Sequence, residues 1–193
     1  EILKKQLSKL NIKIAIVKIN KLEEIKKQKK IFIYNVPLKF KSPFQIKTSE
    51  AKTYVFKCFN IAHSLAVSKK ILGFINAPVD KKIFNGEYLG VTEYLSNKNR
   101  RVGKEVMLIH NKQLSVVPLT THIEIKNVSN KITLNLIMKK IIILKKSYSN
   151  LFKAEPKIAI LGLNPHNSEN RPLSIENKII KPAISKLKKL KIN

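Results

Sequence analysis

The chain has 193 residues, with 39 Lys+Arg against 12 Asp+Glu, a formal charge of +27 and a pI of about 10.2. Its 44% hydrophobic content is too high for a disordered polycation, and a single cysteine, Cys58, excludes an internal disulfide framework. No apolar run reaches the roughly 18 residues of a membrane span, and the lysine-rich start does not resemble a signal peptide, so a reducing, cytoplasmic compartment is expected.

The type of basic residue argues against a nucleic-acid partner. Only Arg100, Arg101 and Arg171 are arginines, whereas nucleic-acid surfaces favour arginine for its bidentate fork and its stacking on bases. Lysine lies on nearly every segment rather than along one stripe. Lys, Ile and Asn all have AT-rich codons and are all abundant, which indicates a compositional bias of the genome rather than a binding surface. We therefore interpret the charge as a solvated lysine coat, and expect neither a nucleic-acid nor a membrane partner.

The first quarter of the chain predicts a helix followed by two strands. Apolar residues recur at helical spacing over residues 2–10, and the β-branched run 12–19 is typical of a strand that is buried on both faces. Residues 20–30 indicate a short charged helix or loop. Residues 31–36 predict a second strand, and 37–48, which contain two prolines, predict a loop.

The clearest predicted helix begins at Ser49, a residue type that caps helices. Its apolar residues form one stripe, so they are expected to face the core. His63 falls on the opposite face and is expected to be exposed, whereas Cys58 lies within the stripe and is more typical of a core residue than of a nucleophile. The stripe consists of Ala51, Tyr54, Val55, Cys58, Ile61, Ala62, Leu65 and Ala66.

The middle of the chain predicts further strands. Residues 71–76 are typical of a strand, and 77–81 of a turn leading out of it. A short helix is predicted over 92–95. The apolar runs 105–110 and 113–119, which are separated by Asn-Lys, predict two adjacent strands joined by a tight turn.

The last third predicts a long helix over 129–151, a buried strand over 158–163, and a lysine-rich helix over 175–190 that Pro182 bends or interrupts. Helices that alternate with strands indicate an α/β layered fold. No repeat or Gly/Ser linker divides residues 1–193. Because the chain does not begin with Met, and the last helix ends without a covering segment, we expect a fragment of one longer α/β chain.

Glycine is too rare for the common nucleotide-binding fingerprints. The five glycines cannot form G-x-G-x-x-G or G-x-x-x-x-G-K-[ST], and no G-x-S-x-G elbow is present. The ordinary dinucleotide, P-loop and serine-hydrolase signatures are therefore excluded.

Two histidines follow directly on predicted strands. His122 comes after the run 114–119, and His166 comes after the run 158–163. Ligands of open α/β sheets bind at the carboxyl edge, and neighbouring strand ends lie about 5 Å apart. The two imidazoles are therefore candidates to share one divalent ion, such as Zn, Co, Ni or Fe. The alternative is that each histidine only caps its loop.

Four segments carry a more specific resemblance. They read N-A-P-V-D-K over 76–81, G-V-T-E-Y-L over 90–95, T-T-H over 120–122 and L-G-L-N-P-H-N over 161–167. In this order they resemble the 4-hydroxythreonine-4-phosphate dehydrogenase family of vitamin B6 biosynthesis. The resemblance runs from about residue 50 to the end of the chain.

The resemblance implies an isocitrate/isopropylmalate-dehydrogenase-like layered fold, here incomplete, which binds NAD without the glycine fingerprint. It implies a homodimer whose active site is shared between subunits, with a divalent metal (Zn, Mg or Co) held by His122 and His166. A further metal histidine would lie in a C-terminal part that this chain does not contain. Thr92 would bind the substrate, and Thr121 and Asn164 are candidates to orient the histidines.

The implied reaction is NAD-dependent oxidation of 4-phosphooxy-L-threonine, a phosphorylated small molecule, followed by decarboxylation to 3-amino-2-oxopropyl phosphate. It belongs to pyridoxal 5'-phosphate biosynthesis, and this chain alone is expected to be inactive. Val91 stands where the family usually has a substrate-contacting histidine. A related metal- and NAD-dependent dehydrogenase of another hydroxy-acid phosphate or diol therefore remains an alternative, and a Lys-rich nucleic-acid-binding module is an alternative of another class.

Overall fold

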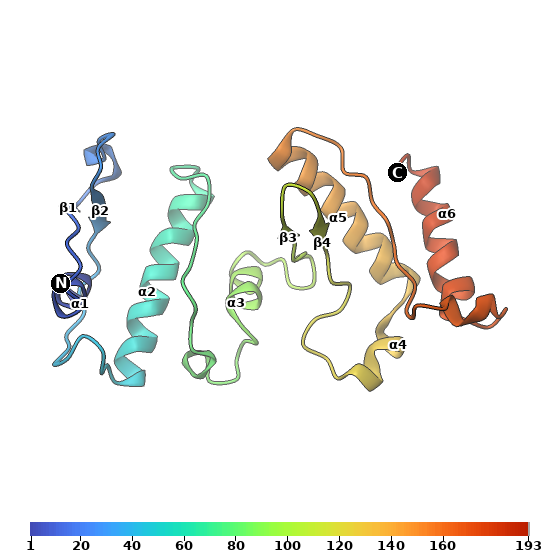
Figure 1. The fold of residues 1–193 in the computed structure, drawn as a ribbon, viewed down its shortest axis with the longest axis horizontal. Coiled ribbons are helices and arrows are strands. Elements are labelled where there is room, and N and C mark those ends of the chain that lie inside the picture. The colour runs from blue at the N-terminus through green and yellow to red at the C-terminus, as the bar shows by residue number, and fades with distance from the viewer. Residues whose placement is uncertain (193) are drawn as a thin grey trace. The chain divides into compact units, whose positions relative to one another are not determined.

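The structure, a computed structural model, describes residues 1–192, except for the side chain of Asn170. It divides into two compact units, Glu1–Val91 and Thr92–Asn193, and each is described by itself. Figure 1 shows the order of helices and strands along the chain. Helices and small sheets are mixed, in agreement with the predicted α/β class. None of the described helices is long and apolar enough to cross a bilayer.

Unit 1 begins with the predicted helix α1 (Ile2–Lys9) and a parallel pair of strands, β1 (Ile16–Ile19) and β2 (Ile31–Tyr34). The short 3-10 helix η1 (Leu22–Glu24) lies in the segment that connects the strands. Both strands occur where the sequence predicts them, although they are shorter. The expectation that the first strand is buried on both faces is wrong, because only Ile19 is buried. Two strands cannot cover each other's faces.

The long helix α2 (Thr48–Val67) confirms the clearest predicted helix, but its start differs. The N-cap is Lys47, without a side-chain cap, so Ser49 lies inside the first turn and its carbonyl accepts a hydrogen bond from Thr53 Oγ1 at 3.2 Å. The predicted stripe is only half-buried, and His63 is half-buried as well rather than exposed.

The core of unit 1 is aromatic. The buried residue of α2 is Phe59, which lies outside the predicted stripe and packs beside Phe74 with ring centroids 6.4 Å apart. Phe56 meets Phe84 edge-on at 5.8 Å, and Phe84 is completely buried. Phe84 ends the 3-10 helix η2 (Lys81–Phe84). Large aromatic side chains reach the core from the edge of a helical stripe. The most buried residue of α2 is therefore Phe59 and not a member of the predicted stripe.

The predicted strand over 71–76 does not form. The segment is irregular in the structure, and Leu72 and Ile75 are fully exposed. A strand needs a hydrogen-bonded neighbour, and none of the described strands pairs with this segment. The turn predicted after it leads into η2, which Asp80 caps by accepting a hydrogen bond from the Lys82 N–H at 2.9 Å.

Unit 2 contains the predicted short helix and the predicted pair of strands. The helix α3 (Val91–Lys98), which begins at the last residue of unit 1, is longer than the expected 92–95. Strands β3 (Ile109–His110) and β4 (Ser115–Val116) are antiparallel, with Ile109 opposite Val116. The tight turn between them is confirmed by a hydrogen bond from the Asn111 N–H to the Leu114 carbonyl at 3.0 Å.

The long predicted helix over 129–151 is interrupted. It consists of a 3-10 turn, η3 (Ile125–Asn127), a short helix, α4 (Val128–Lys131), and the long helix α5 (Leu134–Phe152). Thr133 is extended, and its Oγ1 accepts a hydrogen bond from the Leu136 N–H at 3.1 Å. This side-chain cap starts α5, so the helix cannot run continuously through residue 133.

The predicted strand over 158–163 is also absent as a strand. Ile158 and Ile160 pack against the core, whereas Leu161 is 82% exposed. The alternation is that of an extended segment, but no described strand pairs with it. After the short turn η4 (Asn167–Asn170), the C-terminal helical segment changes type as expected near Pro182, from the π-helical turn η5 (Glu176–Ile180) to α6 (Lys181–Lys189).

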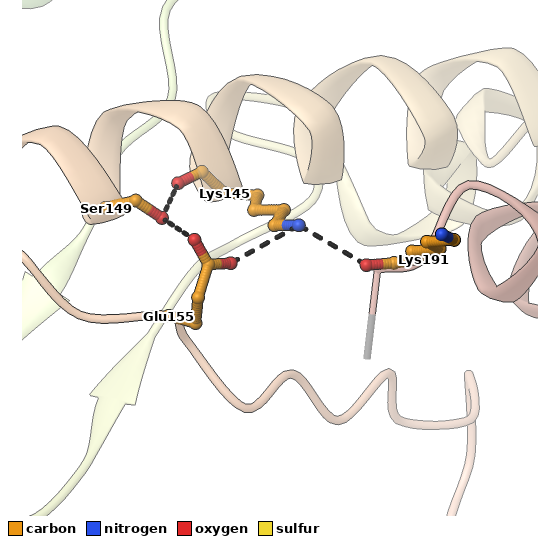
Figure 2. A network of polar contacts seen from close by, with 4 residues as sticks. All are labelled: Lys145, Ser149, Glu155 and Lys191. Carbon is orange, nitrogen blue, oxygen red and sulfur yellow. Dashed lines mark hydrogen bonds and ion pairs between the residues drawn. The ribbon is translucent and has the colours of Figure 1, made fainter.

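The core of unit 2 lies between α5 and the C-terminal helical segment, which Figure 1 shows side by side. Ile137 and Ala183 are at its centre, with 1% and 0% of their surface exposed. The buried members are Ile132, Ile137, Ile141, Leu144, Ile180, Ala183, Leu187 and Ile192. A polar network at the end of α5, drawn in Figure 2, adds a link from Lys145 Nζ to the Lys191 carbonyl at 3.3 Å. The loops that carry His122 and His166 each follow a segment that packs on this core.

Candidate functional site

His122 lies on a loop that follows β4. Val117 and Leu119 anchor the preceding segment on the core of unit 2. His122 itself has a left-handed backbone conformation, with φ of 56°, which is uncommon for a residue other than glycine. Backbone strain of this kind is concentrated at functional sites.

The structure brings His122 to the first turn of α3. His122 Nε2 lies 4.0 Å from Glu93 Oε1, and the two side chains are 35% and 26% exposed. Thr92, the predicted substrate-binding residue, directly precedes Glu93 and is exposed. At 4.0 Å the pair is an ion pair when the imidazole is protonated, but it is too long for a hydrogen bond.

Glu93 was missed by the sequence analysis, which assigned roles to His122, His166, Thr92, Thr121 and Asn164. The available signal is its position directly after Thr92, in a chain with few acidic residues. A carboxylate that accepts a hydrogen bond from an imidazole fixes its tautomer and ring orientation, and Glu93 would have to approach His122 more closely than 4.0 Å to do so. Thr121, the other predicted partner of His122, is half-buried next to it in the chain.

His166 lies on the loop after the extended segment 158–163, and Asn164 organises this loop. Asn164 Oδ1 accepts hydrogen bonds from the His166 N–H at 2.9 Å and the Ser168 N–H at 3.2 Å. Asn164 Nδ2 donates to Ser168 Oγ at 2.9 Å. The predicted partner of His166 therefore contacts its backbone, and the imidazole of His166 is left exposed.

The backbone after His166 is strained. Asn167, Ser168 and Glu169 have φ values of 48°, 50° and 53°, so three consecutive residues other than glycine are left-handed. Gly162, at the other end of the loop, lies against Asn167 Oδ1, so a Cβ at residue 162 would displace that side chain. The loop is compact, and its shape is maintained by side-chain contacts rather than by intrinsic preference.

Glu176 makes one of those contacts from the π-helical turn η5. It is 4% exposed, and its Oε1 accepts a hydrogen bond from the Leu163 N–H at 3.0 Å. Its own backbone N–H is the main group that lowers the pKa of this carboxyl; burial opposes that effect, and the Leu163 N–H and the Ser168 and Ser174 hydroxyls add to it. Glu176 Oε2 is buried and has no hydrogen-bond partner among the residues that the structure describes.

The chain supplies part of a metal-binding donor set. Two neutral imidazoles suit Zn or Co, and Glu93 adds a carboxylate next to one of them. Within residues 1–192, however, no three His, Cys, Asp or Glu side chains form a group that could hold a metal ion. No hydrogen bond or ion pair described in this part of the chain joins the imidazoles of His122 and His166. A metal here would need further ligands.

Two surface hollows of the chain do not include the predicted site residues. One is lined by residues between 4 and 16, and the other by residues between 134 and 142 together with Lys186. Neither lining includes Thr92, His122 or His166, so neither hollow is a candidate cofactor cleft next to the histidines.

The fold and its loops define a mixed helix-and-sheet protein with two exposed histidines on compact loops of one unit. The sequence profile of the family described as "Pyridoxal phosphate biosynthetic protein PdxA" matches residues 1–193. The chain therefore belongs to this family, and the resemblance seen in its sequence is confirmed.

The curated relatives carry the name 4-hydroxythreonine-4-phosphate dehydrogenase. The protein of Aquifex aeolicus is 33% identical over 182 residues, which are 92% of this chain and 56% of the relative. The protein of Wigglesworthia glossinidia brevipalpis is 36% identical over 142 residues, which are 71% and 42% of the two chains. This chain spans about half the length of the curated relatives it matches.

Solved structures with the same name have the same fold. A crystal structure from Klebsiella pneumoniae matches with a TM-score of 0.85 and 23% identity, over 98% of this chain and 61% of that one. A structure from Burkholderia phymatum matches with a TM-score of 0.76 and 25% identity, over 97% and 59%. At 23% identity, the similarity to the Klebsiella structure shows the fold and nothing about activity.

Proposed function

We propose that this chain is part of a longer enzyme that oxidises 4-phosphooxy-L-threonine with NAD, in the biosynthesis of pyridoxal 5'-phosphate. The observation that carries the proposal is the family match over residues 1–193, joined by relatives named 4-hydroxythreonine-4-phosphate dehydrogenase. The substrate's secondary alcohol becomes a ketone, with loss of a hydride and a proton. The resulting β-keto acid then loses carbon dioxide to leave 3-amino-2-oxopropyl phosphate.

His122 and His166 would hold a divalent metal (Zn, Mg or Co), with further ligands from outside this chain. When bound, such a metal stabilises the negative charge that develops on a substrate oxygen. Glu93, 4.0 Å from His122 Nε2, would move within hydrogen-bond distance of that imidazole and hold it in one orientation. Asn164 would keep His166 in place through its backbone N–H, and Thr121 would support the loop of His122.

Thr92 would bind the substrate by hydrogen bonding through its exposed hydroxyl, at the start of α3. Val91 precedes it and has no hydrogen-bonding side chain. A different hydroxy-acid phosphate or a diol as the substrate is therefore the second candidate, and Val91 is the observation that favours it. A panel of these substrates separates the two.

The remaining parts of the proposal concern the whole enzyme. It would have an isocitrate/isopropylmalate-dehydrogenase-like layered fold and act as a homodimer with a shared active site. It would work in the cytoplasm, whose reducing conditions suit the single free Cys58. A chain that lacks some of the metal ligands would be inactive alone. A Lys-rich nucleic-acid-binding module, the alternative of another class, would show binding that falls steeply with salt and needs no metal.

The test uses the full-length polypeptide that contains this chain. NAD reduction is measured with 4-phosphooxy-L-threonine, with and without a chelator, and divalent metal affinity is measured by titration. His122→Ala and His166→Ala are each expected to weaken metal affinity by about 100-fold or more and to remove the chelator-sensitive activity, since a lost ligand costs at least as much as a lost supporting group.

His63→Ala is the matched control, because it removes an imidazole from α2 in the other unit. It is expected to leave metal affinity unchanged. Unchanged activity and affinity in both His122→Ala and His166→Ala would overturn the metal assignment, and absence of NAD reduction with every substrate of the panel would overturn the proposed reaction.

A further inference from the structure

The acidic side chain of Glu176 is buried in a strongly basic chain. It is 4% exposed, and Ser96 is the other polar residue among the buried ones described. Burying a carboxylate is costly unless hydrogen bonds replace its lost water. An apolar side chain would fill the same space without that cost, so packing alone does not explain a glutamate at this position.

The carboxylate holds the beginning of the His166 loop. Its Oε1 accepts a hydrogen bond from the Leu163 N–H at 3.0 Å. Leu163 directly precedes Asn164, whose Oδ1 accepts from the His166 N–H and whose Nδ2 donates to Ser168 Oγ at 2.9 Å. The hydrogen bond from η5 is therefore made one residue before the side chain that holds the His166 N–H.

We propose that Glu176 is a positioning residue for His166: its buried carboxylate holds the Leu163 N–H, and through the adjacent Asn164 it fixes the backbone that carries the imidazole. The proposal rests on the proposed function, in which His166 is a metal ligand. The left-handed run at 167–169 makes such support necessary, because residues other than glycine leave this conformation when nothing restrains them.

The experiment measures three quantities on the full-length polypeptide: affinity for Co²⁺ by titration, the midpoint of thermal unfolding in chelator, and hydrogen exchange of the Leu163 and His166 amides without metal. The variants are Glu176→Ala, Glu176→Gln and Asn164→Ala. Gln keeps an oxygen that can accept the Leu163 N–H, and the exposed Asn164 is truncated without opening a cavity in the core.

Glu169→Gln is the matched control. Glu169 is an exposed carboxylate of the same loop and pairs with Arg171. Glu169→Gln removes the same charge, and it does so closer to His166 along the chain than Glu176→Gln does. A general effect of charge on metal affinity would therefore appear in this variant, and a positioning effect would not.

We expect Glu176→Ala and Asn164→Ala to weaken Co²⁺ binding about 10-fold to 100-fold and to speed exchange of the His166 amide, as losses of supporting groups do. Glu176→Gln should retain Co²⁺ affinity within about threefold of the unmodified protein, and Glu169→Gln should leave it unchanged. The proposal is overturned if Asn164→Ala and Glu176→Ala fold and keep full Co²⁺ affinity and amide protection, or if Glu169→Gln weakens binding as much as they do.

Failure of the proposed function gives a different pattern. If His166 is not a ligand, His166→Ala leaves Co²⁺ affinity intact while Glu176→Ala still speeds exchange of the Leu163 and His166 amides. If Glu176→Ala does not fold, Asn164→Ala and Glu176→Gln decide the matter. Positioning is supported if both keep the unfolding midpoint, Asn164→Ala loses Co²⁺ affinity and Glu176→Gln retains it.

Discussion

The protein has 39 lysines and arginines but only 12 acidic residues. Several of these acidic side chains make contacts within unit 2. Glu105 Oε2 accepts a hydrogen bond from the buried hydroxyl of Ser96 at 2.8 Å. Glu93 lies next to His122, Glu155 links α5 to the segment after it, and Glu176 holds the loop of His166. At the scale of single residues, these four carboxylates each join segments of unit 2 that are separated in sequence, although acidic residues are few.

Glu155 predicts a pH-dependent contribution to stability. The Ser149 hydroxyl, 3.0 Å from Oε1, and then Lys145, 3.3 Å from Oε2, hold the pKa of Glu155 below its ordinary value of 4.5 (Figure 2). The unfolded chain thus binds this proton more readily, so the stabilisation is present above about pH 4.5 and is lost as pH falls through the lower folded-state pKa. Urea unfolding at several pH values should show Glu155→Gln less stable than the unmodified protein at neutral pH, with a difference that shrinks in acid.

The control for Glu155 is Glu23→Gln, an exposed carboxyl in η1 of the other unit. It removes the same charge and should not reproduce the pH-dependent difference. A gap between Glu155→Gln and the unmodified protein that stays constant from neutral pH into acid would contradict the assigned contacts.

The sequence located the two histidines and Asn164, but not the carboxylates near them. His122 and His166 stand directly after apolar runs, and this position is readable along the chain. Glu176 lies 13 residues from its partner Leu163, and Glu93 lies 29 residues before His122. Such pairs depend on how α3, η5 and the loops fold together, so neither composition nor spacing predicts them.

At the scale of elements, local signals succeeded and non-local ones failed. The β3–β4 turn and the cap of η2 depend on neighbouring residues, and both regions form where the sequence predicts a turn. The runs 71–76 and 158–163 have strand-like composition, but a strand also needs a pairing partner, and no described strand supplies one. Apolar composition alone therefore did not predict where a sheet forms.

The Thr133 cap of α5 predicts a measurable loss of stability. Thr133 Oγ1 accepts the Leu136 N–H at 3.1 Å, and the side chain is exposed, so its truncation removes the cap without a packing defect. Thr133→Ala should lower the free energy of unfolding by about 1 kcal/mol. Thr133→Ser keeps a hydroxyl that can cap the helix, so it should retain most of the stability of the unmodified protein. Urea denaturation of the two variants checks this, and equal stability of Thr133→Ala and the unmodified protein would contradict the cap.

At the scale of the whole molecule, the charge of +27 affects stability rather than the choice of fold. Most of the lysines are exposed and have no acidic partner available, because acidic residues are few. Like charges at close spacing repel, and a net charge far from zero therefore destabilises the folded state. The ion pairs described here, such as Lys52 with Glu87 at 3.5 Å, offset only part of this repulsion.

Added salt should therefore stabilise the protein. The Debye length falls from about 30 Å at about 10 mM salt to about 8 Å at about 150 mM, so repulsion between separated lysines is screened while short contacts inside each unit are kept. The midpoint of thermal unfolding should rise between these two concentrations of KCl, and glycerol at matched osmolarity should not reproduce the rise. A midpoint that falls with KCl would mean that attractive ion pairs, such as Lys145 with Glu155, outweigh the repulsion of the lysine coat.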